Sequence, residues 1–115
     1  MTVKIYHNPR CTKSRQTLQL LKDKGIEPEV VEYLKTPPNA DELAGILDKR
    51  GMEPRASMRK QEAEYKAKGL DNAALDKQAL INGMVANPIL IERPIVLSNG
   101  KAAVGRPPEN VLNIL

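Results

Sequence analysis

The stretch "TVKIYHNPRCTKSRQTLQLLKDKGIEPEVVEYL" (residues 2–34) changes its hydrophobic pattern twice. "TVKIY" alternates apolar and polar residues, which is typical of a strand. From Thr12 the apolar residues follow a helical spacing, and Gly25 is the residue type that commonly ends a helix. "EVVEYL" (29–34) then predicts a second strand. Strand, helix and strand within about 30 residues form a βαβ unit, for which a parallel strand pair and a right-handed crossover are expected.

The middle of the chain favours helices. Asn39 followed by Glu42 resembles a capping box, so a helix should begin there, bury an apolar stripe and end at Gly51. Residues 54–86 are expected to be helical in short pieces. The last piece, "DKQALINGMVAN" (76–87), has a stripe that should be buried, made of Leu80, Ile81, Met84 and Val85.

The end of the chain returns to strands. "PIVL" (94–97) and "KAAV" (101–104) flank Asn99-Gly100, a dipeptide that favours a type I′ hairpin. Pro107 and Pro108 should then open a last helix over 109–115. The fold class predicted is α/β, with the order strand, helix, strand, helical insert, two strands and helix. We expect one domain over 1–115, a mixed four-stranded sheet flanked by helices, and an insert at about 39–86.

The amino-acid composition excludes some kinds of site and disfavours some kinds of partner. With 115 residues the chain can bury a core, and its single cysteine and single histidine allow neither an internal disulfide nor a closed zinc site. The net charge of +4 suggests an anionic partner. Basic residues are interleaved with acidic ones and only three tyrosines are present, so a small anion suits the charge better than nucleic acid. The sequence contains neither a signal peptide nor a membrane span, and we expect a cytoplasmic monomer.

The only cysteine, Cys11, lies where the first strand gives way to the first helix. A helix N-terminus has unpaired N–H groups and a partial positive charge, so it favours a thiolate and an incoming oxyanion. The terminus alone contributes about 0.3–1 kcal/mol, so further cations or hydrogen bonds are needed. His7, Ser14 and arginines from elsewhere in the fold are the candidates. Arg15 is a further supporting residue, although taken alone it suits a surface position on the helix. The alternative is that Cys11 only packs in the core, as most free cysteines do.

The segments "HNPRCTKSR", "NPILIERPIV" and "GRPPE", in this order, resemble the arsenate reductase family that uses glutathione and glutaredoxin. The likeness runs over nearly the whole chain and implies a thioredoxin-like fold with a helical insert. It places the reactive cysteine at Cys11 and three substrate-binding arginines at Arg59, Arg93 and Arg106. It also implies a cis peptide bond before Pro94. Arginine suits this task because its rigid, permanently charged fork matches a tetrahedral oxyanion.

The mechanism implied by the resemblance begins with attack of the Cys11 thiolate on arsenate. Glutathione, the reducing co-substrate, then attacks the adduct, and glutaredoxin completes the reduction to arsenite. No tightly bound cofactor and no metal are implied. One step follows from the residues themselves: position 14 is Ser, so the motif lacks a second thiol and an outside thiol is required.

Three departures from the family pattern leave the substrate open. Arg10 and Lys13 replace the usual residues around the cysteine, and the chain ends at Leu115, where other members continue. One alternative is a thiol-redox or glutathione-binding protein with another substrate. Another is a regulator of the same fold that binds RNA polymerase. The lone Cys11 together with all three arginines favours the enzyme.

Overall fold

The computed structural model describes residues 3–115 and divides them into two compact units. The first consists of the described residues up to Thr36 together with Arg93–Leu115, and the second is Pro37–Glu92. The second unit contains the predicted insert and extends beyond it at both ends. No helix within residues 3–115 is both long and apolar enough to cross a lipid bilayer.

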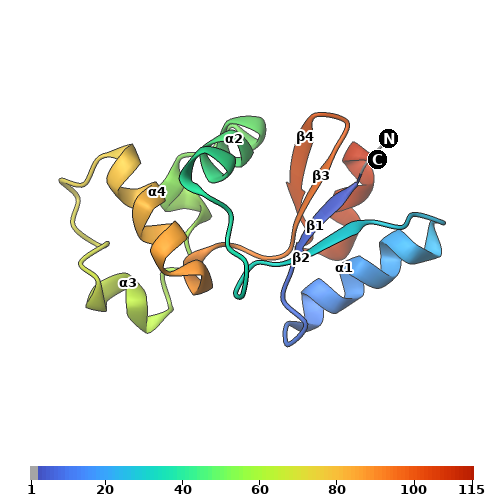
Figure 1. Ribbon diagram of the computed structural model, residues 1–115, viewed down its shortest axis with the longest axis horizontal. Helices are drawn as coiled ribbons and strands as arrows, with labels where there is room; N and C mark the ends of the chain where they lie inside the picture. The colour runs from blue at the N-terminus through green and yellow to red at the C-terminus, as the bar shows by residue number, and fades with distance from the viewer. Residues whose placement is uncertain (1–2) are drawn as a thin grey trace. The chain divides into compact units, whose positions relative to one another are not determined.

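The first unit contains a four-stranded sheet in the order β2-β1-β3-β4. Its strands are β1 (Lys4–His7), β2 (Glu29–Glu32), β3 (Ile95–Ser98) and β4 (Lys101–Val104). β1 pairs in parallel with β2, and it pairs antiparallel with β3, which forms a hairpin with β4. This mixed four-stranded sheet confirms the predicted architecture, although β2 ends two residues earlier than expected (Figure 1).

Helix α1 (Thr12–Asp23) packs against the sheet because one of its faces is apolar. Ile5 from β1 and Val96 from β3 are fully buried against Leu21. The predicted helix end is confirmed: Lys24 is the C-cap, and Gly25 follows with a positive φ of 78°. The predicted turn between β3 and β4 is also confirmed, since Asn99 and Gly100 both have positive φ, as a type I′ hairpin requires.

The last helix differs in kind from the predicted α-helix. It is a 3₁₀ helix, η3 (Pro108–Ile114), whose buried residues are Pro108, Val111 and Ile114. A 3₁₀ helix has three residues per turn, so this spacing places all three buried side chains on one face. Val111 and Ile114 join the core cluster of α1 and the sheet.

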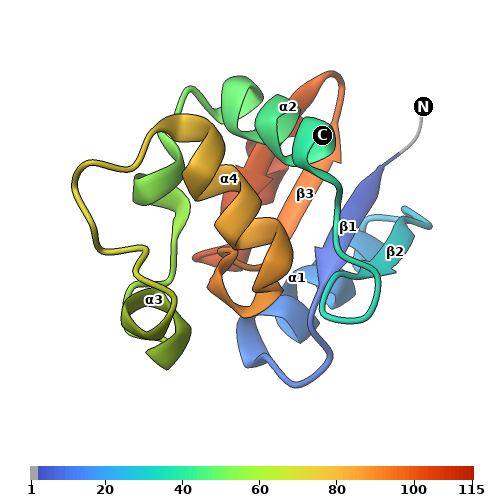
Figure 2. The same cartoon turned by 60° about the vertical axis from the view of Figure 1, so that its left-hand side comes forward.

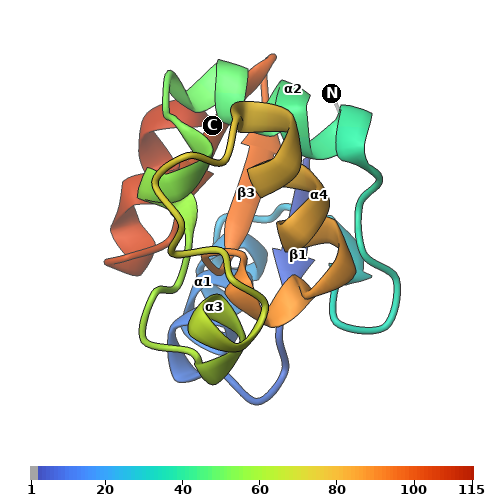
Figure 3. The same ribbon diagram turned by 90° about the vertical axis from the view of Figure 1, so that its left-hand side faces the viewer.

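The second unit contains α2 (Ala40–Arg50), η1 (Pro54–Ser57), α3 (Ala63–Ala67), α4 (Lys77–Ala86) and η2 (Pro88–Leu90). α2 and α4 lie side by side (Figures 2 and 3). The predicted cap of α2 is confirmed, because Asn39 Oδ1 accepts a hydrogen bond of 2.8 Å from the backbone of Glu42. Gly51 ends this helix with a φ of 64°.

Arginines fix the irregular segments of this unit. Arg55 donates hydrogen bonds to the Tyr65 hydroxyl and to the carbonyls of Leu70 and Asn72. Arg50 forms a half-buried ion pair of 2.9 Å with Glu92. The bonds of Arg55 join η1 to α3, which is only five residues long, and to the segment that follows it.

Gly105, between β4 and η3, lies where the backbone comes close to Thr17 of α1 and to Pro94. Its backbone N–H donates a 3.0 Å hydrogen bond to the Pro94 carbonyl. A Cβ at this position would lie 2.9 Å from Pro94 Cγ, 3.0 Å from Thr17 Cγ2 and closer still to Thr17 Oγ1. We therefore expect Gly105→Ala to lower the free energy of unfolding by about 1–3 kcal/mol, the usual cost of overpacking, as measured by urea denaturation.

Gly45→Ala is the matched control. Gly45 lies inside α2, and a Cβ there meets no atom within 4 Å. Alanine is the better helix former by up to about 1 kcal/mol, so this variant should be as stable as the parent or more stable. Equal loss of stability in both variants would contradict the close-packing argument.

Candidate functional site

The site begins at Cys11, which is the N-cap residue of α1 and is 9% exposed. Its own N–H donates a 3.0 Å hydrogen bond to the Asn8 carbonyl, and its carbonyl accepts one from Arg15 N. The side chain does not cap the helix through an oxygen, as Ser or Asp would. The sulfur instead lies at the positive end of the helix, as the sequence predicts.

Backbone and side-chain donors surround this sulfur. Burial raises the pKa of Cys11, but hydrogen bonds from the Ser14 N–H, the Arg93 side chain and the Lys13 N–H outweigh it. The pKa of Cys11 is therefore lower than that of an ordinary thiol. This arrangement favours the reactive-thiolate interpretation over the core-packing alternative.

Two of the three predicted arginines meet at the sulfur. Arg106 Nη2 donates to Cys11 Sγ at 3.5 Å, and Arg106 Nε donates to the Arg93 carbonyl at 2.7 Å. Burial lowers the pKa of Arg93, but interactions with Cys11 and Tyr33 raise it by more, so its charge is retained. Arg93 Nε and Nη1 are buried and have no hydrogen-bond acceptor within residues 3–115. These two donors are available to an oxyanion.

Arg93, before β3, and Arg106, after β4, are each followed by a cis peptide bond. The Arg93-Pro94 bond is cis, as the resemblance implies. The Arg106-Pro107 bond is also cis, which the sequence analysis did not predict.

Arg59, the third predicted arginine, belongs to the second unit. It follows Met58, which forms an isolated antiparallel β-bridge with Ile91. The backbone N–H of Arg59 donates a 2.8 Å hydrogen bond to the Leu90 carbonyl. Its guanidinium forms an ion pair of 3.2 Å with Glu62.

The predicted supporting residues His7, Ser14 and Arg15 form hydrogen bonds around the loop that precedes α1. A 2.6 Å hydrogen bond joins His7 Nδ1 to Ser14 Oγ, and the same oxygen accepts from the Asn8 N–H at 3.0 Å. His7 therefore contacts Ser14, whose N–H donates to the sulfur. Arg15 has a surface position, as expected, and ties the loop by donating to the Pro9 carbonyl at 2.9 Å.

The sequence analysis missed two residues of this site. Asn8 positions both Cys11 and Ser14, and its place beside Pro9 in the motif was the available signal. Tyr33 follows β2 and is 1% exposed, with a hydroxyl that interacts with Arg93. No motif marks Tyr33, since its role depends on β2 lying next to β1 in the sheet.

The charges and donors of the site can bind an anion and activate a thiol, and both tasks use the same groups. Within residues 3–115, no three side chains of the His, Cys, Asp or Glu type gather into a metal site. The chemistry available to the described residues is nucleophilic attack by sulfur, with guanidinium groups stabilising negative oxygens.

The lowered pKa of Cys11 predicts alkylation below the pH range of an ordinary thiol. Iodoacetamide labelling followed by intact mass should give a rate profile whose midpoint lies below about 8.5, the unperturbed cysteine value. Arg93→Gln should move that midpoint upward, because a cation and a hydrogen bond are lost. Arg10→Gln removes an exposed cation next to the thiol and serves as control; an equal upward shift in both variants would contradict a specific role for Arg93.

The buried histidine predicts a pH-dependent stability. Burial lowers the pKa of His7; the charge of Glu32 raises it in part, and the charges of Arg15 and Lys22 lower it further. The unfolded chain, in which a histidine titrates at about 6.5, thus binds more protons than the folded chain just below that pH. Stability contributed by neutral His7 is complete above about pH 6.5 and declines as the pH falls toward the folded value.

Urea unfolding from pH 7.5 to 5.5 measures this effect, since His7 is the only histidine. His7→Asn should flatten the decline over that range. An unchanged slope in the variant would show that another group causes the decline.

Comparisons with known proteins agree with this geometry. The model of the ArsC family matches residues 6–114. The chain is 54% identical over 114 residues to an arsenate reductase of Neisseria meningitidis, covering 98% of this chain and 97% of the relative. It is 57% identical to the uncharacterised protein YfgD of Escherichia coli K12, covering 98% and 96%. The solved structure of an arsenate reductase from Vibrio cholerae superposes with a TM-score of 0.96 at 51% identity, covering 100% and 98%. The predicted thioredoxin-like fold is confirmed, and this chain belongs to the ArsC family.

Proposed function

We propose that this protein reduces arsenate to arsenite through a covalent adduct on Cys11. The observation that carries the proposal is the pair Arg93 and Arg106 at the sulfur, with Arg93 Nε and Nη1 buried and unused. A tetrahedral oxyanion placed there meets donors on its oxygens and a thiolate at its centre. The names of the full-length relatives support arsenate as that anion.

The first step is substitution at arsenic. The Cys11 thiolate attacks, an S–As bond forms, and one As–O bond breaks so that the oxygen leaves as water after taking up a proton. Arsenic stays in the +5 state. Arg93 and Arg106 stabilise the negative oxygens while this happens, which is the task that preorganised donors perform best.

The second step needs electrons from outside the chain, because Cys11 is its only cysteine. We propose glutathione as the source. Its thiolate attacks the Cys11 sulfur, an S–S bond forms and the S–As bond breaks. The electron pair of that bond stays on arsenic, which leaves as arsenite in the +3 state. Glutaredoxin then reduces the mixed disulfide and restores the thiol.

Arg59 is included among the arsenate ligands on the resemblance alone. In the second unit the Arg59 guanidinium forms an ion pair with the Glu62 carboxylate. A substrate anion bound by Arg59 would therefore take the place of that carboxylate. The reducing partners place the reaction in a reducing compartment, and we propose the cytoplasm.

The test is arsenate-dependent NADPH oxidation in a coupled assay containing glutathione, glutaredoxin and glutathione reductase. Cys11→Ser should lose activity completely, since no other thiol can form the adduct. Arg93→Ala should lose at least about a hundredfold in kcat/KM, the usual effect of removing one charge-stabilising donor. Arg10→Gln is the control with a cation lost outside the oxyanion site.

Activity that survives Cys11→Ser would exclude the mechanism. A parent protein that is inert with arsenate but still forms a mixed disulfide with glutathione would replace this function by that of a glutathione-binding or thiol-redox protein.

A further inference from the structure

Tyr33 lies in the turn after β2 and is 1% exposed, whereas Leu34 beside it is 40% exposed. The backbone of this turn is fixed, because the Glu32 carbonyl accepts hydrogen bonds of 2.9 Å from the N–H groups of Lys35 and Thr36. The hydroxyl oxygen of Tyr33 is buried together with the ring. Burial of a polar atom is costly unless that atom interacts with another group, so this hydroxyl should have a task.

Strand order and register place Tyr33 and Arg93 at the same end of the sheet. β1 and β2 are parallel and pair as far as His7 with Glu32, so Tyr33 comes next after β2 where β1 passes into the loop before α1. β3 runs in the opposite direction and starts at Ile95, two residues after Arg93. β1 lies between β2 and β3 (Figure 2). Two strand spacings amount to about 10 Å, so only long side chains can meet across β1.

The side chains of Tyr33 and Arg93 do interact. Burial lowers the pKa of Arg93, and the side chains of Cys11 and Tyr33 raise it by more. A guanidinium group has donors only, so the phenol oxygen is the acceptor in this contact. The same guanidinium donates to the Cys11 sulfur, while its buried Nε and Nη1 meet no acceptor among the described residues. One flexible side chain therefore has to serve the sulfur and an anion together, which requires a fixed orientation.

We infer that Tyr33 is a positioning residue: its buried hydroxyl holds the Arg93 guanidinium at the Cys11 sulfur and leaves Nε and Nη1 for an oxyanion. For the sulfur, the inference depends on the contacts alone; for the oxyanion, it rests on the proposed function. Arginine has one of the most flexible side chains, and ordering it costs free energy. Without the hydroxyl, Arg93 adopts more orientations and spends less time at the sulfur. Tyr33 acts through Arg93 only.

The alternative is that Tyr33 only fills space, and Tyr33→Phe separates the two roles because it keeps the ring and removes one oxygen. The measurement is the pH midpoint of Cys11 alkylation by iodoacetamide, followed by intact mass. It is made on the parent, Tyr33→Phe, Arg93→Gln and the variant with both changes. In such a double-mutant cycle, a residue that acts through Arg93 loses its effect once the guanidinium is gone.

We expect Tyr33→Phe to raise the midpoint by about 0.5–1 pH unit, less than the shift of about 1–3 units that a neighbouring charge can cause. In the Arg93→Gln background, Tyr33→Phe should cause no further shift. An unchanged midpoint in Tyr33→Phe would overturn the inference. So would an equal shift in both backgrounds, because the hydroxyl would then act on the sulfur without Arg93.

Tyr65→Phe is the matched control. Its hydroxyl also contacts an arginine, accepting a 2.7 Å hydrogen bond from Arg55 Nη1, but both residues belong to the second unit. The midpoint of Cys11 alkylation should not change in this variant. A shift equal to that of Tyr33→Phe would show that loss of any tyrosine–arginine contact disturbs the thiol, and the inference would fail.

The alkylation assay contains no arsenate, so its outcome is separate from the fate of the proposed function. A parent protein that is inert with arsenate can still show the coupling between Tyr33 and Arg93. In the coupled arsenate assay, Tyr33→Phe should lower kcat/KM by about three- to tenfold, the usual effect of one hydrogen bond. An unchanged kcat/KM in an active enzyme would leave the function intact and overturn the oxyanion part of the inference.

Discussion

A cysteine whose pKa is lowered although the residue is only 9% exposed is the constraint on which the rest of this structure depends. Burial opposes the charge, and the helix terminus alone is too weak to compensate for it. The compensation comes from groups far apart in the chain: the N–H of Ser14, the guanidinium of Arg93 and that of Arg106. The sheet brings them together, because β1 and β3 are neighbours although some ninety residues separate them.

The reactive groups of the site are held in place by hydrogen bonds and close packing with their neighbours. The carbonyl of Arg93 orients Arg106 through a 2.7 Å hydrogen bond, so the two guanidinium groups are not independent. Beneath the sulfur, His7 and Asn8 hold the Ser14 hydroxyl and thus fix the turn that presents the N–H groups. Gly105 allows the segment that carries Arg106 to approach α1, since any side chain there would meet Thr17 and Pro94. Sequence positions without reactive groups therefore set the geometry of the reaction.

Much of this architecture can be read from local signals. Gly25 and Gly51 mark helix ends, Asn39 marks a helix start, and Asn99-Gly100 marks the hairpin, because each needs a backbone conformation or cap that few other residues supply. The Met58–Ile91 bridge and the 3₁₀ geometry of η3 depend on packing partners distant in sequence, which no local pattern encodes. For the site, the family resemblance predicted Cys11, Arg93 and Arg106, which the structure brings together. The Tyr33–Arg93 interaction depends on strand order and was missed.

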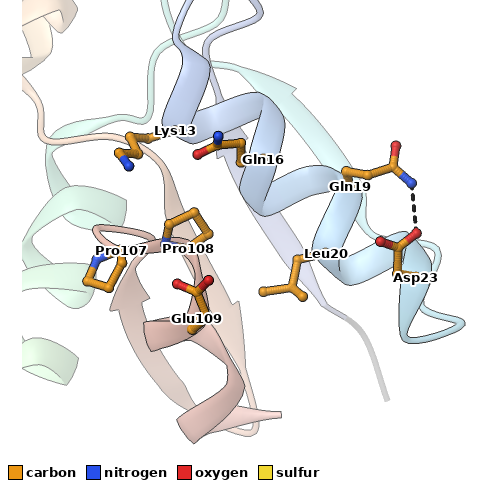
Figure 4. A pocket seen from close by; sticks show the side chains of 8 residues that line it. All are labelled: Lys13, Gln16, Gln19, Leu20, Asp23, Pro107, Pro108 and Glu109. Carbon is orange, nitrogen blue, oxygen red and sulfur yellow. Dashed lines mark hydrogen bonds between the residues drawn. The ribbon is translucent and has the colours of Figure 1, made fainter.

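Helix α1 has one face buried against the sheet and one face directed outward. Thr17 and Leu21 are buried toward the sheet, whereas Gln16 and Gln19 line a groove between α1 and η3 (Figure 4). Because the helical repeat keeps these faces apart, exchanging an outward residue leaves the hydrophobic core and the sulfur's donors as they are. The outward face of α1 can thus vary among relatives while the thiol keeps its surroundings, although the two kinds of position are only one residue apart.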